Sequence, residues 1–442
     1  MIAQKAKTAV FLIGDIAILY GALVLTLLIR YGQSNFYPSL LVHIKPFSFL
    51  FIVWFLIFYL SNLYDDKFYK HNIATIQAFI LAIAINIAIS IILLYIFSDF
   101  FKLTPKTNLL IFGAVYGAVD YFWRLILTSL FISGGLKKQI MLIGNSTSIN
   151  SIAEYLKNNP QIGYAIKSLI QEGLSDKNFS DIVSSITSKK IYSLVIDDKI
   201  KSNPLGSKLI YRLLPLDIQI IDSSLFFETL FNKVPLDELE ESWFIESIVA
   251  GRKIYDAAKK SIDFLMSLLL LILFSPLMIL ISIIIKLTSE GPIIFKQERI
   301  GKGEMPFVLY KFRTMIINHN GSLWTEKNDS RLTFIGKIIR YTHLDELPQL
   351  VNILKGNISF IGPRPERSEL VQMYKKLPYY EIRHIIKPGL TGWAQLNYKP
   401  SASLEEAYKK LQYDVYYIKN RSLLLDFLIV LKTIRYFFIS HQ

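Results

Sequence analysis

Long apolar runs constrain the fold of this chain more than any other feature. Four of them open the sequence, at residues 10–29, 47–63, 73–97 and 109–132. Each is close to the ~20 residues that a helix needs to cross the hydrocarbon layer of a membrane. Hydrophobic residues make up 52% of the chain and the mean hydropathy is +0.37, which is too apolar for an ordinary soluble enzyme. We therefore expect a membrane protein whose residues 1–136 form a bundle of four transmembrane helices.

The charge balance indicates which side of the membrane the loops face. The chain has 49 Lys and Arg against 35 Asp and Glu, a formal net charge of +14. Such an excess is typical of cytoplasmic loops, anionic lipid and phosphate partners. The sequence lacks helix-turn-helix, zinc-finger and aromatic RNA-binding signatures, so we expect no nucleic-acid partner. The positive-inside rule places both ends of the bundle in the cytoplasm, because lysines flank the runs at Lys5, Lys7, Lys67, Lys70, Lys137 and Lys138.

Three ionisable residues fall at membrane depth. Asp120 and Arg124 are four residues apart and can neutralise each other on one helix face, while Asp15 lies near the start of the first run. A charge inside a membrane is by default a functional hypothesis. A structural ion pair, or side chains that reach the cytoplasmic surface, explains these residues equally well.

Residues 137–236 show a different pattern, in which short apolar strands alternate with helices. The expected strands are 139–144, 194–197 and 217–221, and the expected helices are 149–158 and 205–214. This alternation predicts a small doubly wound parallel sheet. The dinucleotide fingerprint needs three glycines, but here Gly144 is followed by Asn145 and Ser146. We therefore expect a degenerate Rossmann-like domain without a working NAD site.

A fifth apolar run, residues 262–285, follows an acidic linker at 237–258 and opens the last domain, 259–442. Ser275 and Pro276 interrupt its middle, where proline breaks the hydrogen-bond ladder. Both flanks are basic, which indicates that both ends stay in the cytoplasm. We expect a helix–break–helix hairpin that enters one leaflet and returns. The alternative is a kinked helix that spans the membrane.

Two adjacent carboxylates, Asp345 and Glu346, stand where a helix is expected to begin. With Asp345 as the N-cap, Pro348 falls in the first turn, where proline is tolerated. Lys355 and Gly356 would close the helix. The alternative is that Asp345 only caps the helix and Glu346 only complements its dipole. Consecutive helical side chains point about 100° apart, so the two acids are suited to different tasks.

Basic residues gather in the sequence around this dyad. Arg364 stands between Pro363 and Pro365, which makes it a stiffened guanidinium suited to binding phosphate. Further candidates for the same task are Arg299, Lys311, Arg313, Arg340 and Arg383. Residues 295–301 and 307–312 predict a short hairpin, and residues 423–438 an interfacial helix.

Five motifs of the last domain occur in an order that resembles the bacterial sugar transferases, the polyprenyl-phosphate hexose-1-phosphate transferases. They lie at residues 297–301, 311–315, 345–349, 362–365 and 387–395. The whole chain is similar in architecture to the large form of this family: four spans, a Rossmann-like domain and a monotopic phosphoglycosyl transferase domain. The resulting fold class is a membrane protein of α and α/β parts, with a mainly helical catalytic domain.

The resemblance implies a reaction in which a sugar 1-phosphate moves from a UDP-sugar to undecaprenyl phosphate, with release of UMP. It implies that Asp345 is the nucleophile, that Glu346 binds Mg²⁺, and that Ser275 and Pro276 break the reentrant helix. It places the chain in the bacterial inner membrane, with its catalytic domain in the cytoplasm. The chain would act at the first membrane step of capsule, exopolysaccharide or O-antigen synthesis, with membrane lipid and a second copy of the chain as further partners. Asn357 departs from the acid that the family often has there, so its share in metal binding is in doubt.

Two other classes of function compete with this enzyme. One is a non-catalytic membrane scaffold or regulator of polysaccharide export, in which the N-terminal bundle does the work. The other is a nucleotide-binding redox protein that uses the middle domain, against which the missing glycines argue. The sequence leaves open which sugar is transferred and which pathway is served.

Overall fold

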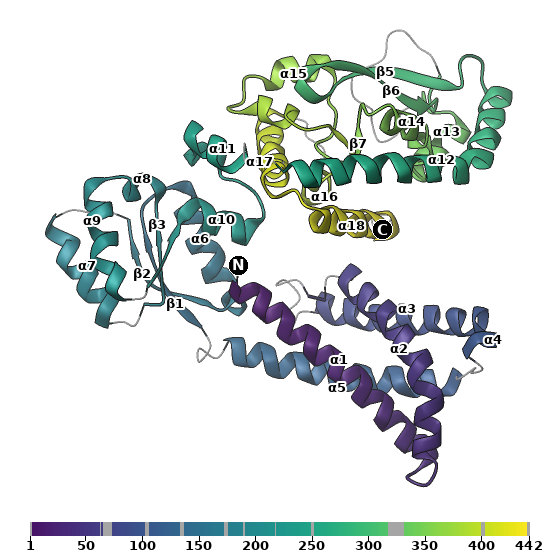
Figure 1. Ribbon diagram of the computed structural model, residues 1–442, viewed down its shortest axis with the longest axis horizontal. Helices are drawn as coiled ribbons and strands as arrows, with labels where there is room; N and C mark the ends of the chain where they lie inside the picture. Colours follow the sequence, from purple (N-terminus) through teal and green to yellow (C-terminus); the bar gives the residue numbers. More distant parts are fainter. Residues whose placement is uncertain are drawn as a thin grey trace. The chain divides into compact units, whose positions relative to one another are not determined.

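The fold was analysed in a computed structural model. It describes residues 2–61, 63–64, 73–101, 106–132, 137–171, 176–188, 191–216, 218–248, 252–316, 331–398 and 403–439, so the predicted topology lysines Lys67 and Lys70 lie outside the described residues. The chain divides into two compact units, Met1–Leu230 and Phe231–Gln442, which are described separately (Figure 1).

The first unit begins with long apolar helices. They are α1 (Ile2–Tyr31), α2 (Phe36–Leu60), α3 (Ile73–Ile96) and α5 (Lys106–Ile132), with the short α4 (Ser98–Phe101) after α3. Aromatic residues of α2 and α5, namely Phe47, Trp54, Phe58, Phe112 and Tyr116, form the centre of their core, to which α1 and α3 add apolar side chains. Between 28% and 39% of the apolar window of each long helix is buried, so most of its side chains face outward. Each is long and apolar enough to cross a membrane, as the sequence predicts.

The three ionisable residues predicted at membrane depth meet in one buried cluster. Arg124 donates to Asp120 and to Asp15, both at 2.7 Å, and to the carbonyl of Leu63 at 2.9 Å. The hydroxyl of Tyr64 donates to Asp15 at 2.7 Å. The predicted Asp120–Arg124 pair is therefore confirmed. The bond from Arg124 to Asp15 also ties α5 to α1.

The rest of the first unit is a four-stranded parallel sheet in the order β2-β1-β3-β4. Its strands are β1 (Lys138–Ile143), β2 (Tyr164–Ile170), β3 (Ser193–Ile196) and β4 (Gln219–Asp222). Helices α7 (Asp176–Ser188) and α9 (Pro204–Leu213) cover one face and α6 (Thr147–Asn158) and α10 (Ser223–Phe231) the other, while the short α8 (Asp198–Lys201) precedes α9 (Figure 1). The parallel sheet is confirmed, although the sequence analysis missed β2 and α7. Gly144, with φ +134°, lets β1 approach β3: a Cβ there would lie 2.5 Å from that of Asp197.

A segment of residues 232–248, here called the strap, opens the second unit. It contains the 3-10 turn Leu236–Glu238 and α11 (Glu241–Ile248), and buries Val234, Leu236, Phe244 and Ile248 against α17 (Leu404–Asn420). Residues 237–258 were predicted to be a linker. Much of that stretch is instead part of the core of the second unit, because its apolar residues pack there.

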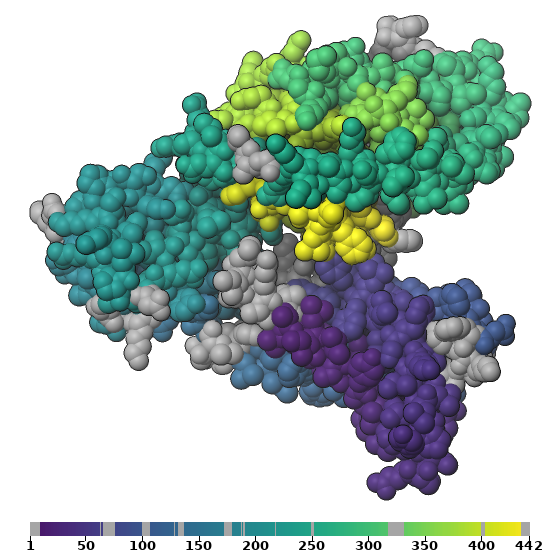
Figure 2. Space-filling view, in the orientation of Figure 1, coloured from purple at the N-terminus to yellow at the C-terminus, as the bar shows by residue number. Residues whose placement is uncertain are grey.

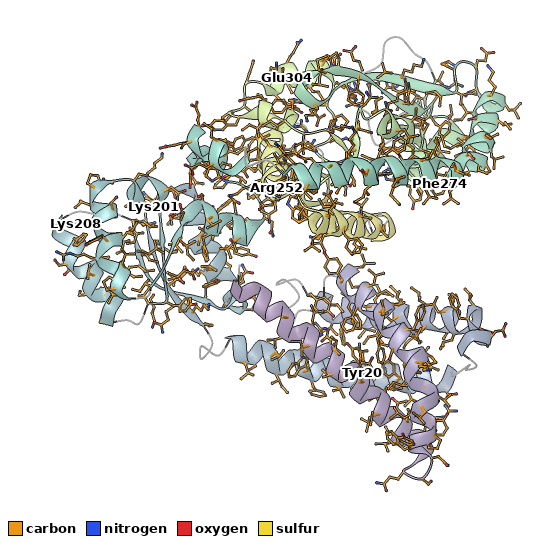
Figure 3. All side chains as sticks on the ribbon, in the orientation of Figure 1. Tyr20, Lys201, Lys208, Arg252, Phe274 and Glu304 are labelled. Carbon is orange, nitrogen blue, oxygen red and sulfur yellow. The ribbon has the colours of Figure 1, made fainter. Side chains whose placement is uncertain are left out.

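Helix α12 (Lys253–Thr288) contains the fifth apolar run. The hydroxyl of Ser275 donates to the carbonyl of Ile272 at 2.8 Å, one turn before Pro276. The ribbon changes direction just past Phe274 (Figure 1, Figure 3). The expected interruption of the helix is therefore wrong: α12 is continuous over 36 residues, and it bends without breaking.

Helix α18 (Leu423–Ile439) lies beside the first half of α12 (Figure 1, Figure 2). Asp426 joins them: it accepts hydrogen bonds from Lys259 at 2.7 Å, Tyr255 at 2.9 Å and Tyr417 at 2.8 Å. The exposed side of both helices is apolar, with Leu265, Leu269, Ile272, Leu273, Leu424 and Phe427 each more than half exposed.

Short strands and helices complete the second unit. The predicted hairpin is confirmed as the antiparallel pair β5 (Ile294–Ile300) and β6 (Pro306–Phe312), and β7 (Ser359–Ile361) pairs in parallel with β8 (Gly389–Thr391). The helices are α13 (Phe334–Tyr341), α14 (Gln349–Leu354), α15 (Ser368–Tyr374) and α16 (Trp393–Asn397). Both halves of α12 pack near the dyad: Leu270 and Leu271 meet α14, while Ile281 and Ile285 meet α13.

Candidate active site

The carboxylate dyad lies in a tight turn between α13 and α14. Asp345 and Glu346 belong to the 3-10 turn Leu344–Glu346, which follows His343 in a left-handed conformation, φ +55°. Helix α14 begins only at Gln349, with Pro348 as its N-cap. Asp345 is therefore not the helix N-cap that the sequence analysis expected. The reversal at His343 starts a separate turn first, and this turn carries both acids.

Glu346 is paired with a lysine from the hairpin. The Lys311 Nζ lies 2.5 Å from Oε1 of Glu346, and both side chains are 20% exposed. Asn352, fully buried on α14, fixes the position of α14 against β6. Its side-chain Nδ2 donates to the carbonyl of Val308 at 2.7 Å, and its Oδ1 accepts from the backbone N–H of Tyr310 at 3.0 Å. A salt bridge that neighbouring hydrogen bonds position in this way presents its charges in one geometry.

Asp345 is 7% exposed, and this burial raises the pKa of its carboxyl to about 6. Lys311 and Arg340 oppose the rise, while the charge of Glu346 adds to it. Burial also acts on Glu346, but there Lys311 and Arg364 outweigh it and lower its pKa. At pH 7 about nine tenths of Asp345 is then ionised. The site therefore holds two neighbouring carboxylates with different proton affinities, a pattern typical of groups with separate chemical roles.

The charges of Lys311, Arg340, Arg364 and Arg299 act on the dyad, and phosphate binding by these residues stays a prediction. Arg364 is exposed on the loop after β7, and its charge acts on both Glu346 and Arg299. Arg299 is half-buried and donates to the carbonyl of Pro365 at 3.0 Å; burial and the charge of Arg364 lower its pKa to about 10. Together these cations can neutralise a bound phosphate beside Asp345.

Two predicted phosphate ligands are engaged elsewhere. Arg313 donates to the carbonyls of Glu290 and Ser289 at 2.6 and 2.9 Å, and so holds the chain just after α12. Arg383 is 5% exposed and its Nη2 lies 3.1 Å from Asp414. The prediction that these two arginines bind phosphate is corrected, because their guanidinium groups bind protein oxygens instead.

Within the described ranges, no group of three or more His, Asp or Glu residues is placed to hold a metal ion. Mg²⁺ does not require such a cage, because it commonly takes one or two carboxylates together with substrate phosphates and water. Glu346 uses Oε1 for Lys311, which leaves Oε2, and Asp345 lies next to it. The dyad thus fits an ion held mainly by substrate oxygens. The backbone N–H of Asn357 donates a hydrogen bond to the carbonyl of Asn352 at 3.0 Å.

Sequence reasoning missed the buried polar residues that support the site. Asn352 has a recognisable signal, since it is a polar residue within the apolar stretch of α14. Glu366 and Asp414, both buried, carry no comparable local signal, because their partners are distant in the sequence. Only the folded structure shows that both lie against Arg383, which donates to the carbonyl of Arg364.

A buried Asp345 next to Glu346, surrounding cations and helices long enough to cross a membrane fit the class of membrane enzymes that act on phosphorylated substrates. Residues 254–440 match the profile of the bacterial sugar transferases. The chain is also similar, over a longer stretch, to a UDP-glucose:undecaprenyl-phosphate glucose-1-phosphate transferase of Escherichia coli K12. The two are 30% identical over 315 residues, which is 67% of each chain. This chain belongs to the bacterial sugar transferase family.

Two more relatives match over a shorter length of the chain. A UDP-N-acetylgalactosamine-undecaprenyl-phosphate N-acetylgalactosaminephosphotransferase of Aeromonas hydrophila is 44% identical over 211 residues, 47% of this chain and 49% of that protein. An exopolysaccharide production protein of Rhizobium leguminosarum bv. phaseoli is 38% identical over 185 residues, 40% of this chain and 92% of that protein. The chain thus spans about half of the Aeromonas relative and two thirds of the Escherichia one.

Proposed function

We propose that this chain transfers a sugar 1-phosphate from a UDP-sugar to undecaprenyl phosphate and releases UMP. Two relatives are named for this kind of transfer, with glucose or N-acetylgalactosamine as the sugar. The observation that carries the proposal is the buried, mostly ionised Asp345 beside the Lys311–Glu346 pair. The reaction would be the first membrane step in building a surface polysaccharide, either capsule, exopolysaccharide or O-antigen.

In the first half-reaction, a carboxylate oxygen of Asp345 attacks the phosphorus that carries the sugar. A bond forms between that oxygen and phosphorus, the bond to the bridging oxygen breaks, and UMP leaves with the bridging oxygen. Lys311 and Arg364 offset the negative charge that otherwise repels a carboxylate from a phosphate. A carboxylate that is ionised at neutral pH needs no general base, so His343 is given no role.

In the second half-reaction, a phosphate oxygen of undecaprenyl phosphate attacks the same phosphorus. Asp345 leaves as a carboxylate, and the product is undecaprenyl diphosphate sugar. Splitting one displacement into two easier steps is the advantage of a covalent intermediate. Glu346 would hold Mg²⁺ together with donor phosphate oxygens. When bound, the ion would neutralise charge on the diphosphate.

The membrane placement belongs to the same proposal. Helices α1, α2, α3 and α5 form a transmembrane bundle, while α12 enters one leaflet and returns through its bend at Pro276. The basic flanks of α12 support a cytoplasmic location for both of its ends, where UDP-sugars are made. The membrane would be the bacterial inner membrane. A homodimer is a further expectation, which native mass spectrometry in detergent would test.

Mass spectrometry of purified protein incubated with donor alone tests the chemistry. A panel of UDP-sugars should include one that adds a single sugar phosphate to the peptide carrying Asp345, and undecaprenyl phosphate should then remove the adduct and yield product. Asp345→Asn should abolish both the adduct and UMP release. Turnover without the adduct, or full activity in Asp345→Asn, would refute the nucleophile.

The competing proposal is a membrane scaffold, which draws on the first unit. That unit lies outside residues 254–440, the part that matches the family profile. The Rhizobium relative, named as an exopolysaccharide production protein, is matched over 92% of its length by 40% of this chain, so nearly the whole of that protein corresponds to a part of this one. A scaffold would lose its function when the first unit is deleted, whereas the enzyme should keep turnover.

A further inference from the structure

The loop that carries Arg364 is held through four consecutive backbone carbonyls. Their donors are the Gly389 amide to Pro363 at 2.9 Å, Arg383 to Arg364 at 2.8 Å, Arg299 to Pro365 at 3.0 Å and the Ile300 amide to Glu366 at 3.0 Å. Loops usually leave several carbonyls to water. Hydrogen bonds at each of these positions fix the backbone of the loop, and with it the point from which the exposed Arg364 side chain extends.

A buried charge network lies beneath this loop. Nη2 of Arg383, which donates to the Arg364 carbonyl, also lies 3.1 Å from Oδ2 of Asp414. Glu366 pairs with Lys410 at 2.7 Å and lies 3.8 Å from Nη1 of Arg383. The side chains of these four residues are at most 10% exposed, and their charges sum to zero. Such a network specifies one geometry, because each buried charge needs its partners.

We propose that Arg383 is a positioning residue for the transfer reaction. With Asp414, Glu366 and Lys410 as its support, it fixes the backbone of Arg364 so that the Arg364 guanidinium stays beside Glu346 and the bound phosphate. This inference rests on the proposed function, in which Arg364 neutralises the donor phosphate. It gives Arg383 an indirect role instead of the direct phosphate contact that the sequence suggested.

The chemistry of the two arginines favours this division of labour. Arg383 is buried against protein oxygens, whereas the Arg364 side chain is exposed. A long exposed side chain loses conformational entropy when it binds phosphate. A backbone that is already fixed adds no further entropy cost to binding. The charge of Glu366 is well secured within the network. Burial would raise the pKa of Glu366, but Lys410 and Arg383 hold it at about 2.

The first test measures position without turnover. The chain has no cysteine, so Arg364→Cys in the full-length protein accepts a single nitroxide label. We expect Arg383→Lys to make that label more mobile in electron paramagnetic resonance spectra. Arg313→Lys is the matched control: it alters another arginine that is 5% exposed and binds carbonyls, but away from this loop, and should leave the label unchanged. If Arg383→Lys does not fold, Asp414→Asn replaces it, because Asp414 pairs with the same Nη2.

The second test is a double-mutant cycle on kcat/KM for UMP release. Arg364→Ala should lose about 10²-fold or more, and Arg383→Lys roughly 10–10²-fold through misplacement. The double variant should be no worse than Arg364→Ala, since placement no longer matters once the guanidinium is gone. Additive losses, or a label whose mobility is the same with and without Arg383, would overturn the inference. An inactive wild type with a mobilised label would instead refute the proposed function and leave the positioning role standing.

Discussion

The burial of Asp345 predicts that the natural residue destabilises the fold at neutral pH. Its pKa rises from 3.8 to about 6 on folding, a difference of about 2 units at 1.36 kcal/mol each. The folded state therefore binds the proton more tightly than the unfolded state does. The ionised carboxylate costs about 3 kcal/mol at pH 7, about half of that at pH 5, and almost nothing below pH 4. Asp345→Asn removes the charge at nearly constant shape and should recover this energy.

Thermal unfolding of the full chain in detergent measures the effect, with hydrogen exchange used to follow peptides of the second unit. For a unit of this size, 1 kcal/mol corresponds to roughly 2–4 °C. The Asp345→Asn protein should thus melt roughly 6–12 °C higher than wild type at pH 7.5, and the gap should shrink as the pH falls from 6 to 4. Gln349→Glu offers no such relief and serves as a control, because it adds a buried charge nearby. A variant that melts at or below wild type at pH 7.5, or a gap that persists at pH 4, would refute the reasoning.

Three other predictions follow from the site, the bent helix and the strap. Adduct formation should fall about tenfold from pH 7 to pH 5 as Asp345 is protonated, and Lys311→Gln should move the midpoint of a rapid-quench pH profile above 6, because Lys311 lowers the pKa of Asp345. Single cysteines at Lys259 and Lys296 should both react only from the cytoplasmic side of vesicles, and labelling from opposite sides would mean that α12 spans. A truncated chain that begins at Phe231 should keep UMP release, whereas one that begins after the strap should have a free energy of unfolding lower by several kcal/mol, because it loses a buried apolar segment. Equal free energies of unfolding for the two truncated chains would contradict the strap's role.

The long apolar helices and the parallel sheet could be predicted because hydropathy and alternation are local signals. The edge strand β2 was missed because it has no fully buried residue and exposed side chains, such as Lys167, interrupt the apolar pattern. The dyad was also found from the sequence, since its two acids are adjacent. Its conformation was not, because the left-handed turn at His343 depends on how α13 and α14 pack.

The basic residues show where sequence reasoning ends. Lys311 and Arg364 were assigned to the site and lie there, but Arg313 and Arg383 looked the same in the sequence and bind carbonyls of the protein. Composition and spacing identify a cation, but they do not show whether its guanidinium faces solvent or the interior. That depends on contacts between segments far apart in the chain, here between η7 (Tyr380–His384) and the loop after β7.

The three hydrogen bonds that Asp426 accepts also have a mechanical meaning. Two of them come from α12 and the third from α17, so the first half of the bent helix cannot tilt independently of α18. If α12 tilted alone, the Asp426 carboxylate would lose its partners Lys259 and Tyr255 in an apolar setting, which is energetically costly. The exposed apolar side chains of the first half of α12 and of α18 should accordingly enter or leave the lipid together, as one rigid body.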